Sequence, residues 1–163
     1  MHIIPSSTSS HNDFDFYLGK WNIHNRKLKS RLKRCTEWIE FEATDEDINA
    51  LRGLANLNFY KCTIDGKPFE GMTVRLFNPV TKLWSIYWAD SNVGILDTPV
   101  VGSFDNKIGR FFATDQFEGK PIRVQFQWDA TNPANPIWSQ AFSDDEGKTW
   151  EWNWYMHASK MKT

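Results

Sequence analysis

Two arginines and the acidic residues that could pair with them carry the clearest chemistry of the sequence. Arg75 lies in the run TVRLF and Arg123 in the run IRVQFQW. A guanidinium group matches the geometry of a carboxylate, so either arginine could bind an anion inside a pocket. Either could instead lie outside, or pair with Glu40 or Asp115 in a structural network, because charged side chains are mostly exposed. Both interpretations stay open from the sequence alone.

His24 shares a strand face with Arg26 in the run KWNIHNRKL, whereas His2, His11 and His157 lie near the ends of the chain. A neutral imidazole can transfer a proton or ligate a metal or haem. No two histidines have the spacing of a zinc site, so the sequence predicts no metal. His24 is therefore a candidate polar group of a binding site or simply a surface residue. The sequence predicts no cofactor, and the alternative is a haem group.

Four side chains could act as acid or base if the fold brought them together, namely His24, Glu40, Tyr87 and Asp115. Such a group would suit an isomerase or a hydrolase. The chain has no Gly-x-Ser-x-Gly, P-loop or Gly-x-Gly-x-x-Gly motif, so no catalytic residue is assigned. The run DDEGKTW is predicted to be a turn between two strands. The full set of candidate ligand-binding residues is His24, Arg26, Trp38, Glu40, Arg75, Tyr87, Trp88, Asp115, Arg123 and Gln140.

A basic run between Lys27 and Arg34 also contains Lys29, Arg31 and Lys33. Positive charge beside aromatic residues could contact phosphates or nucleic-acid bases. The chain as a whole has a formal charge of −1 and no nucleic-acid-binding motif. We therefore predict a solvated hairpin here and no nucleic-acid partner.

Length and composition indicate one domain. The chain has 163 residues, and nine Trp and twelve Phe make it rich in aromatic side chains. Residues 1–12 are predicted to be flexible, 13–158 to form the domain and 159–163 to be a tail. The beginning of the chain lacks the pattern of a secretory signal, and no apolar run approaches a membrane span, so we predict a cytoplasmic protein with no membrane partner. Cys35 and Cys62 are interpreted as buried thiols.

Nearly all of the chain after Gly19 alternates as β-strands do. About nine or ten short strands, separated by turn signals every 8–12 residues, are typical of a sandwich or barrel. The sequence predicts a turn at Asp45 to Asp47, a third strand from Leu51 onward, and one shared face for Trp150, Trp152 and Trp154. A meander of hairpins closes most readily as an antiparallel up-and-down barrel, and the many tryptophans favour that architecture over a thin sandwich.

The Gly-x-Trp pattern in LGKW (Leu18 to Trp21) resembles the opening of many lipocalin-type barrels, in which the Trp closes one end. Taken in order, the segments DFDFYLGKWNIHNR, CTEWIEFEAT, TVRLFNPVTKLWSIYWAD, PVVGSF, IRVQFQWDAT and WSQAFSDDEGKTWEWNWYM resemble a bacterial family of unknown function with a calycin-like β-barrel. The resemblance covers residues 13–156 and implies a lipocalin-like barrel of about 8–10 strands with an internal cavity.

The predicted function is binding of a small, partly hydrophobic and anionic ligand inside the barrel. The alternatives are an enzyme that uses acid and base residues of the interior, a haem-binding barrel, and a homodimeric interaction protein.

Overall fold

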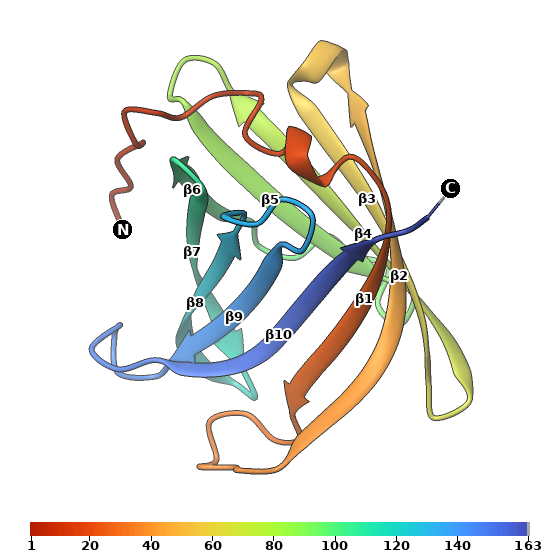
Figure 1. Ribbon diagram of the computed structural model, residues 1–163. Coiled ribbons are helices and arrows are strands. Elements are labelled where there is room, and N and C mark those ends of the chain that lie inside the picture. Colours follow the sequence, from red (N-terminus) through yellow and green to blue (C-terminus); the bar gives the residue numbers. More distant parts are fainter. Residues whose placement is uncertain (163) are drawn as a thin grey trace.

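Ten antiparallel strands close into one barrel (Figure 1). The computed structural model describes residues 1–162. Each strand pairs with its neighbours along the chain, and β10 pairs with β1 to close the barrel, so the predicted all-β up-and-down barrel is confirmed. The strands are β1 Gly19–Leu28, β2 Trp38–Ala50, β3 Ala55–Ile64, β4 Lys67–Asn78, β5 Leu83–Asp90, β6 Val100–Asp105, β7 Ile108–Phe117, β8 Lys120–Asp129, β9 Ile137–Ser143 and β10 Glu151–Lys160.

Two short 3-10 turns, η1 (Asp15–Tyr17) and η2 (Leu51–Gly53), accompany the strands. Within residues 1–162, no helix has the length and apolar character needed to cross a membrane. The strands follow the twofold period of their side chains. In β1, for example, Trp21, Ile23 and Asn25 are buried, while the residues between them are exposed.

The predicted turn at Asp45 to Asp47 is wrong, because these residues lie within β2. The alternation of this strand continues through them, so Asp45 and Asp47 are buried and Glu46 is exposed. Three consecutive charged residues are typical of a turn. Here Asp45 and Asp47 have polar partners on other elements, so the strand can continue through them. The chain instead turns at η2, where Leu51, Arg52 and Gly53 all have positive φ, and β3 begins at Ala55 rather than at Leu51.

The prediction that Trp150, Trp152 and Trp154 share a face is also wrong. Trp152 pairs with Ala141 and Trp154 pairs with the next residue back, Gln140, so β10 contains a bulge. The extra residue reverses the alternation. Trp154 therefore points into the barrel, where it meets the Trp138 ring edge-on at 5.6 Å between centroids.

Aromatic side chains fill the end of the barrel near η1. Phe14 meets Trp84 and Phe104 edge-on, with ring centroids 4.9 and 5.0 Å apart, and Tyr17 stacks on Trp21 at 4.9 Å. Trp21 is 1% exposed, and its Nε1 donates a hydrogen bond of 2.7 Å to the Tyr17 carbonyl oxygen. Burying a side chain the size of Phe contributes roughly 1.5–3 kcal/mol. This cluster closes one end of the barrel, as the Gly-x-Trp resemblance implies for Trp21.

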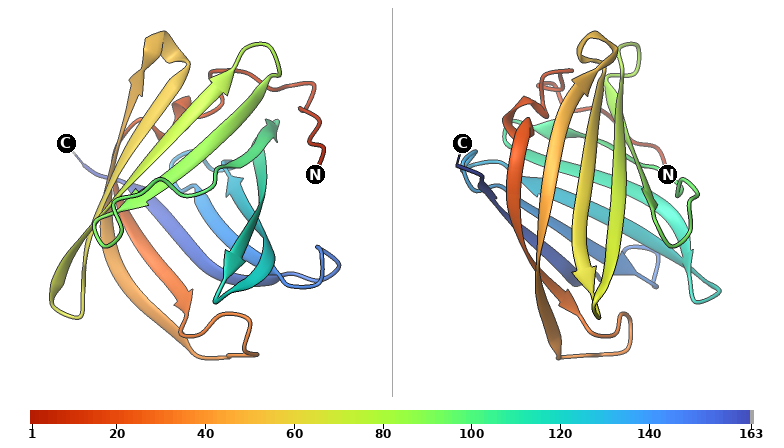
Figure 2. Two further views of the ribbon diagram at one scale, coloured as in Figure 1. Left: turned by 180° about the vertical axis from the view of Figure 1, so that it is seen from behind. Right: turned by 90° about the vertical axis from the view of Figure 1, so that its right-hand side faces the viewer.

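The opposite end carries the β1–β2 loop and the β3–β4 and β7–β8 turns (Figure 2). Residues 1–12 pass over the closed end. The Ser6 amide donates to Ser103 Oγ at 2.9 Å, and Trp84 Nε1 donates to the Ser10 carbonyl oxygen at 3.3 Å. The architecture is compatible with a calycin-like barrel, in which one end is closed and the other gives access to the interior.

Candidate functional site

The barrel encloses a cavity of about 710 Å³. Its lining includes Asp65 of the β3–β4 turn and Asn92 of the β5–β6 loop, both exposed, so it opens at the end opposite η1. Sites for small molecules usually span about 300–1,000 Å³ and are mostly apolar. The wall of this cavity fits that description, since it includes Ile86, Val124, Phe126, Trp138, Phe142 and Met156.

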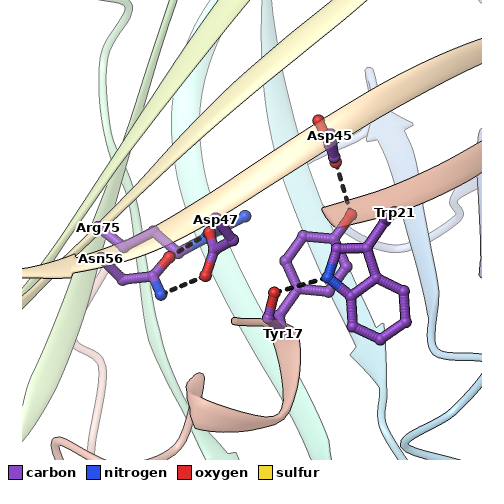
Figure 3. A network of polar contacts seen from close by, with 6 residues as sticks. All are labelled: Tyr17, Trp21, Asp45, Asp47, Asn56 and Arg75. Carbon is purple, nitrogen blue, oxygen red and sulfur yellow. Dashed lines mark hydrogen bonds and ion pairs between the residues drawn. The ribbon is translucent and has the colours of Figure 1, made fainter. Parts of the chain in front are cut away.

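The floor of the cavity, at the closed end, contains a buried ion pair (Figure 3). Arg75 Nη1 from β4 donates to Asp47 Oδ1 of β2 at 2.9 Å and also to Asn56 Oδ1 of β3. Asn56 Nδ2 donates to Asp47 Oδ2 at 2.5 Å. The guanidinium carbon lies 4.7 Å from the centre of the Phe14 ring. Arg75 therefore faces the cavity with its charge already paired.

A second carboxylate, Asp45, lies beside this pair and accepts a hydrogen bond of 2.5 Å from the Tyr17 hydroxyl. Burial raises the pKa of Asp45, while the Tyr17 hydroxyl and the Arg75 charge act in the opposite direction. Burial likewise raises the pKa of Asp47 to about 6, although Arg75 and Asn56 act to lower it. Burial and the charge of Asp45 raise the pKa of Tyr17. One guanidinium thus serves two carboxyl groups, and the floor has no cation left for an anionic ligand.

Three buried polar atoms of the floor have no hydrogen-bond partner among residues 1–162, namely Asp45 Oδ1, Asn58 Nδ2 and Arg75 Nε. The Asn58 amide is close enough to lower the pKa of Asp45, but the two groups do not meet hydrogen-bond geometry. The floor is therefore polar, and several of its hydrogen-bonding atoms lack partners, whereas the wall above it is apolar.

Two cations, Lys27 and Arg31, lie at the open end of the cavity. Lys27 Nζ lies 4.2 Å from the centre of the Trp154 ring, and the Arg31 guanidinium carbon lies 4.8 Å from the centre of the Phe117 ring. Within the described chain, no carboxylate lies at ion-pair distance from either of them. Burial, together with the like charge of Arg31, lowers the pKa of Lys27 to about 8. Burial also lowers the pKa of Arg31, against the charges of Glu118 and Glu151.

The β1–β2 loop that carries Arg31 is fastened across this end of the barrel. The Leu32 amide donates to Glu151 Oε1 at 2.9 Å, and Lys33 Nζ lies 3.2 Å from Glu118 Oε2 in the β7–β8 turn. The basic run is thus not uniformly solvated, contrary to the prediction. Lys29 and Lys33 are exposed and paired with glutamates, whereas Lys27 and Arg31 face the cavity.

The opposite wall is acidic. In the closed strand order, β6 is five strands from β1 in either direction, and three carboxylates line the cavity on or beside its neighbours. They are Asp90 on β5, Asp97 in the β5–β6 loop and Asp115 on β7. Burial raises the pKa of Asp97, and the charges of Asp115 and Asp90 add to the effect. The cations that line the cavity thus lie on the β1 side, and these three carboxylates lie across from them.

The structure brings together about half of the residues predicted for the site. Arg75, Trp88, Asp115 and Gln140 line the cavity. Glu40 lies at its rim, although its carboxylate is 3.4 Å from His24 on the outer surface.

The other predicted residues lie outside the cavity lining, as described by the structure: His24, Arg26, Trp38, Tyr87 and Arg123. Arg26 stacks on Trp38, with the guanidinium carbon 4.1 Å from the ring centre. His24 lies between Glu42 and Glu40, whose hydrogen bonds raise its pKa. On this outer face, His24 is not placed to ligate a group inside the barrel.

In the part of the chain that the structure describes, no three His, Cys, Asp or Glu side chains are grouped so that they could hold a metal ion. Cys35 and Cys62 are both free thiols and are half-buried rather than fully buried.

Sequence reasoning missed two groups of site residues. Asp45 and Asn58 line the polar floor, Asp47 and Asn56 hold Arg75 behind it, and Lys27 and Arg31 lie at the open end. The period of two that starts at Trp21 reaches Lys27 on the same face, so an inward lysine could have been predicted. The same period, continued from Ala43, reaches Asp45 and Asp47.

No protein-family model matches this chain, and no curated protein matches its sequence. The relation to a bacterial calycin-like family therefore stays a prediction.

Proposed function

We propose that the protein binds a small, partly hydrophobic, anionic molecule in the barrel cavity. The observation that carries this proposal is the pair of cavity-facing cations, Lys27 and Arg31, for which residues 1–162 offer no carboxylate at ion-pair distance. Lys27 and Arg31 are half-buried, a partly desolvated charge without a counter-ion is unfavourable, and an anionic ligand group would supply the missing partner. At neutral pH, Lys27 is still mostly protonated, because its pKa is about 8.

The distribution of charge also supports an orientation for the ligand. The floor has no free cation, and the wall across from β1 carries Asp90, Asp97 and Asp115. An anionic group is therefore favoured beside β1 at the open end, and the apolar body would extend along the aromatic wall. The calycin-like family and the bacterial source rest on the sequence resemblance alone, and the cytoplasmic location stays a prediction from the sequence.

Two fluorescent probes with nearly the same rings test this proposal. Anilinonaphthalene sulfonate (ANS) carries an anionic sulfonate, and phenylnaphthylamine (NPN) lacks it. We expect ANS to bind more tightly than NPN, and Lys27→Gln or Arg31→Gln to weaken ANS binding by about tenfold while leaving NPN binding nearly unchanged. Fluorescence titration of the wild type and of the two variants with each probe gives the six dissociation constants.

Lys29→Gln is the matched control, because it removes one charge from the same run on a side chain that faces solvent and pairs with Glu37. It should bind both probes as the wild type does. If neither probe binds, the cavity does not take up such molecules and the whole proposal fails. Equal affinities of ANS and NPN in the wild type would overturn its anionic part.

A further inference from the structure

Lys27 has an unusual environment for a lysine. It lies at the end of β1, directly opposite Ile39 of β2 and Trp154 of β10, so the residues paired with it on both sides are uncharged. Its ammonium nitrogen lies over the Trp154 ring, 4.2 Å from the ring centre, and the side chain lines the cavity. The charge that shifts its pKa is a like charge, that of Arg31.

These surroundings increase the fraction of neutral amine, although the ammonium ion still predominates at neutral pH. Burial and the neighbouring Arg31 lower the pKa of Lys27 to about 8, compared with an ordinary value of 10.5. At pH 7 the amine is then neutral in about a tenth of the molecules. This fraction is more than a hundredfold larger than for an ordinary lysine. Only the neutral amine is a nucleophile, and a lysine beside another cation in an apolar pocket is a known way to activate one.

We propose that Lys27 Nζ forms a reversible imine with an aldehyde or ketone group of a molecule bound in the cavity. The amine nitrogen attacks the carbonyl carbon, a proton passes from nitrogen to the carbonyl oxygen, and water leaves as the carbon–nitrogen double bond forms. No oxidant or reductant is needed. The inference rests on the proposed cavity binding and adds a reactive group to it.

The residues around Lys27 suit this reaction. The aromatic wall beside it, with Trp154 and Phe142, would hold an apolar carbonyl compound close to the amine. Arg31 would bind an acidic group on the same molecule. The ligand class is thus an aromatic or aliphatic aldehyde or ketone, of which those with an added acidic group fit both cations.

Reductive trapping tests the inference directly. The protein is incubated with methoxynaphthaldehyde and sodium cyanoborohydride, which reduces an imine to a stable secondary amine, and peptide mass spectrometry locates the label. We expect labelling at Lys27 at least about tenfold faster than at Lys29, in proportion to the larger neutral fraction. Labelling spread evenly over exposed lysines would overturn the inference.

Lys27→Arg separates the reactive amine from the positive charge. This variant retains a cation at the open end, so it should bind ANS more tightly than Lys27→Gln does, but it should lose the label at position 27 and show no compensating fast site. Arg31→Gln should slow labelling of Lys27, because the like charge that favours its neutral form is removed. If ANS binds the wild type but the aldehyde is not trapped at Lys27, the imine inference alone fails. If neither occurs, the proposed function fails with it.

Discussion

Asp47 shows at the scale of one residue how the interior of the barrel tolerates charge. Its carboxylate is buried, bonded to Arg75 and Asn56, and still has a pKa raised to about 6. Burial therefore outweighs the ion pair, as is common when two charges leave water together. The pair is best understood as a means of fixing β2, β3 and β4 in register at the floor, rather than as a large source of stability.

The raised pKa of Asp47 has a consequence for stability. The folded chain holds this proton up to a pH of about 6, whereas an ordinary aspartate releases it near 3.8. Between these values the folded state binds more protons than the unfolded state, so the free energy of unfolding falls as the pH rises. Over that interval we expect the wild type to lose about 1–3 kcal/mol more than Asp47→Asn, measured by urea unfolding at several pH values.

Asp105→Asn provides the control, because Asp105 is exposed. This variant should keep the slope of the wild type against pH. If the free energy of unfolding of Asp47→Asn varied with pH as that of the wild type does, other groups such as Asp45 would govern its dependence at acidic pH.

Elements were more predictable than the contacts between them. The ten strands follow from alternation and turn residues. A strand with one buried and one solvent-exposed face shows alternating apolar and polar residues in its sequence. The pairing of Asp47 with Arg75 joins residues 28 positions apart, and no local pattern contains it. The same holds for the bulge in β10, which reverses the face of Trp154 through a single extra residue.

The β4–β5 pair shows how one small residue shapes the cavity. Gly71 of β4 lies against the Trp88 ring of β5, and a Cβ atom at Gly71 would come within 2.0 Å of that ring. We expect Gly71→Ala to move Trp88 and to lower the free energy of unfolding by about 1–3 kcal/mol. Urea unfolding and the tryptophan emission spectrum measure the two effects.

Trp88→Phe in the Gly71→Ala background should recover part of the lost stability, since the smaller ring leaves room for the added methyl group. A Gly71→Ala protein with the emission and stability of the wild type would contradict the close packing of these two strands.

At the scale of the whole molecule, the two ends of the barrel have separate tasks. The closed end contains the aromatic cluster and the polar floor, and residues 1–12 cover it through hydrogen bonds to Ser103, Phe104 and Trp84. The cations that line the cavity lie at the open end, across from the acidic wall. This division separates what stabilises the fold from what would recognise a ligand.

Removal of residues 1–12 tests this division. The truncated protein loses several hydrogen bonds at the closed end, and we expect its free energy of unfolding to fall by about 1–2 kcal/mol. Its affinity for ANS should stay within about twofold of the wild type, because Lys27 and Arg31 lie at the other end. Urea unfolding and fluorescence titration give both quantities. A large loss of ANS affinity would show that the two ends are coupled.

The β1–β2 loop that is fastened across the open end also concerns the time that a molecule spends inside. The bonds from Leu32 to Glu151 and from Lys33 to Glu118 hold the loop at the open end, where Arg31 lines the cavity. If a molecule passes this loop on its way in and out, the loop must open in both directions, and these bonds would then slow uptake and escape by the same factor. They can therefore set the residence time of a molecule in the barrel without changing how tightly it is held at equilibrium.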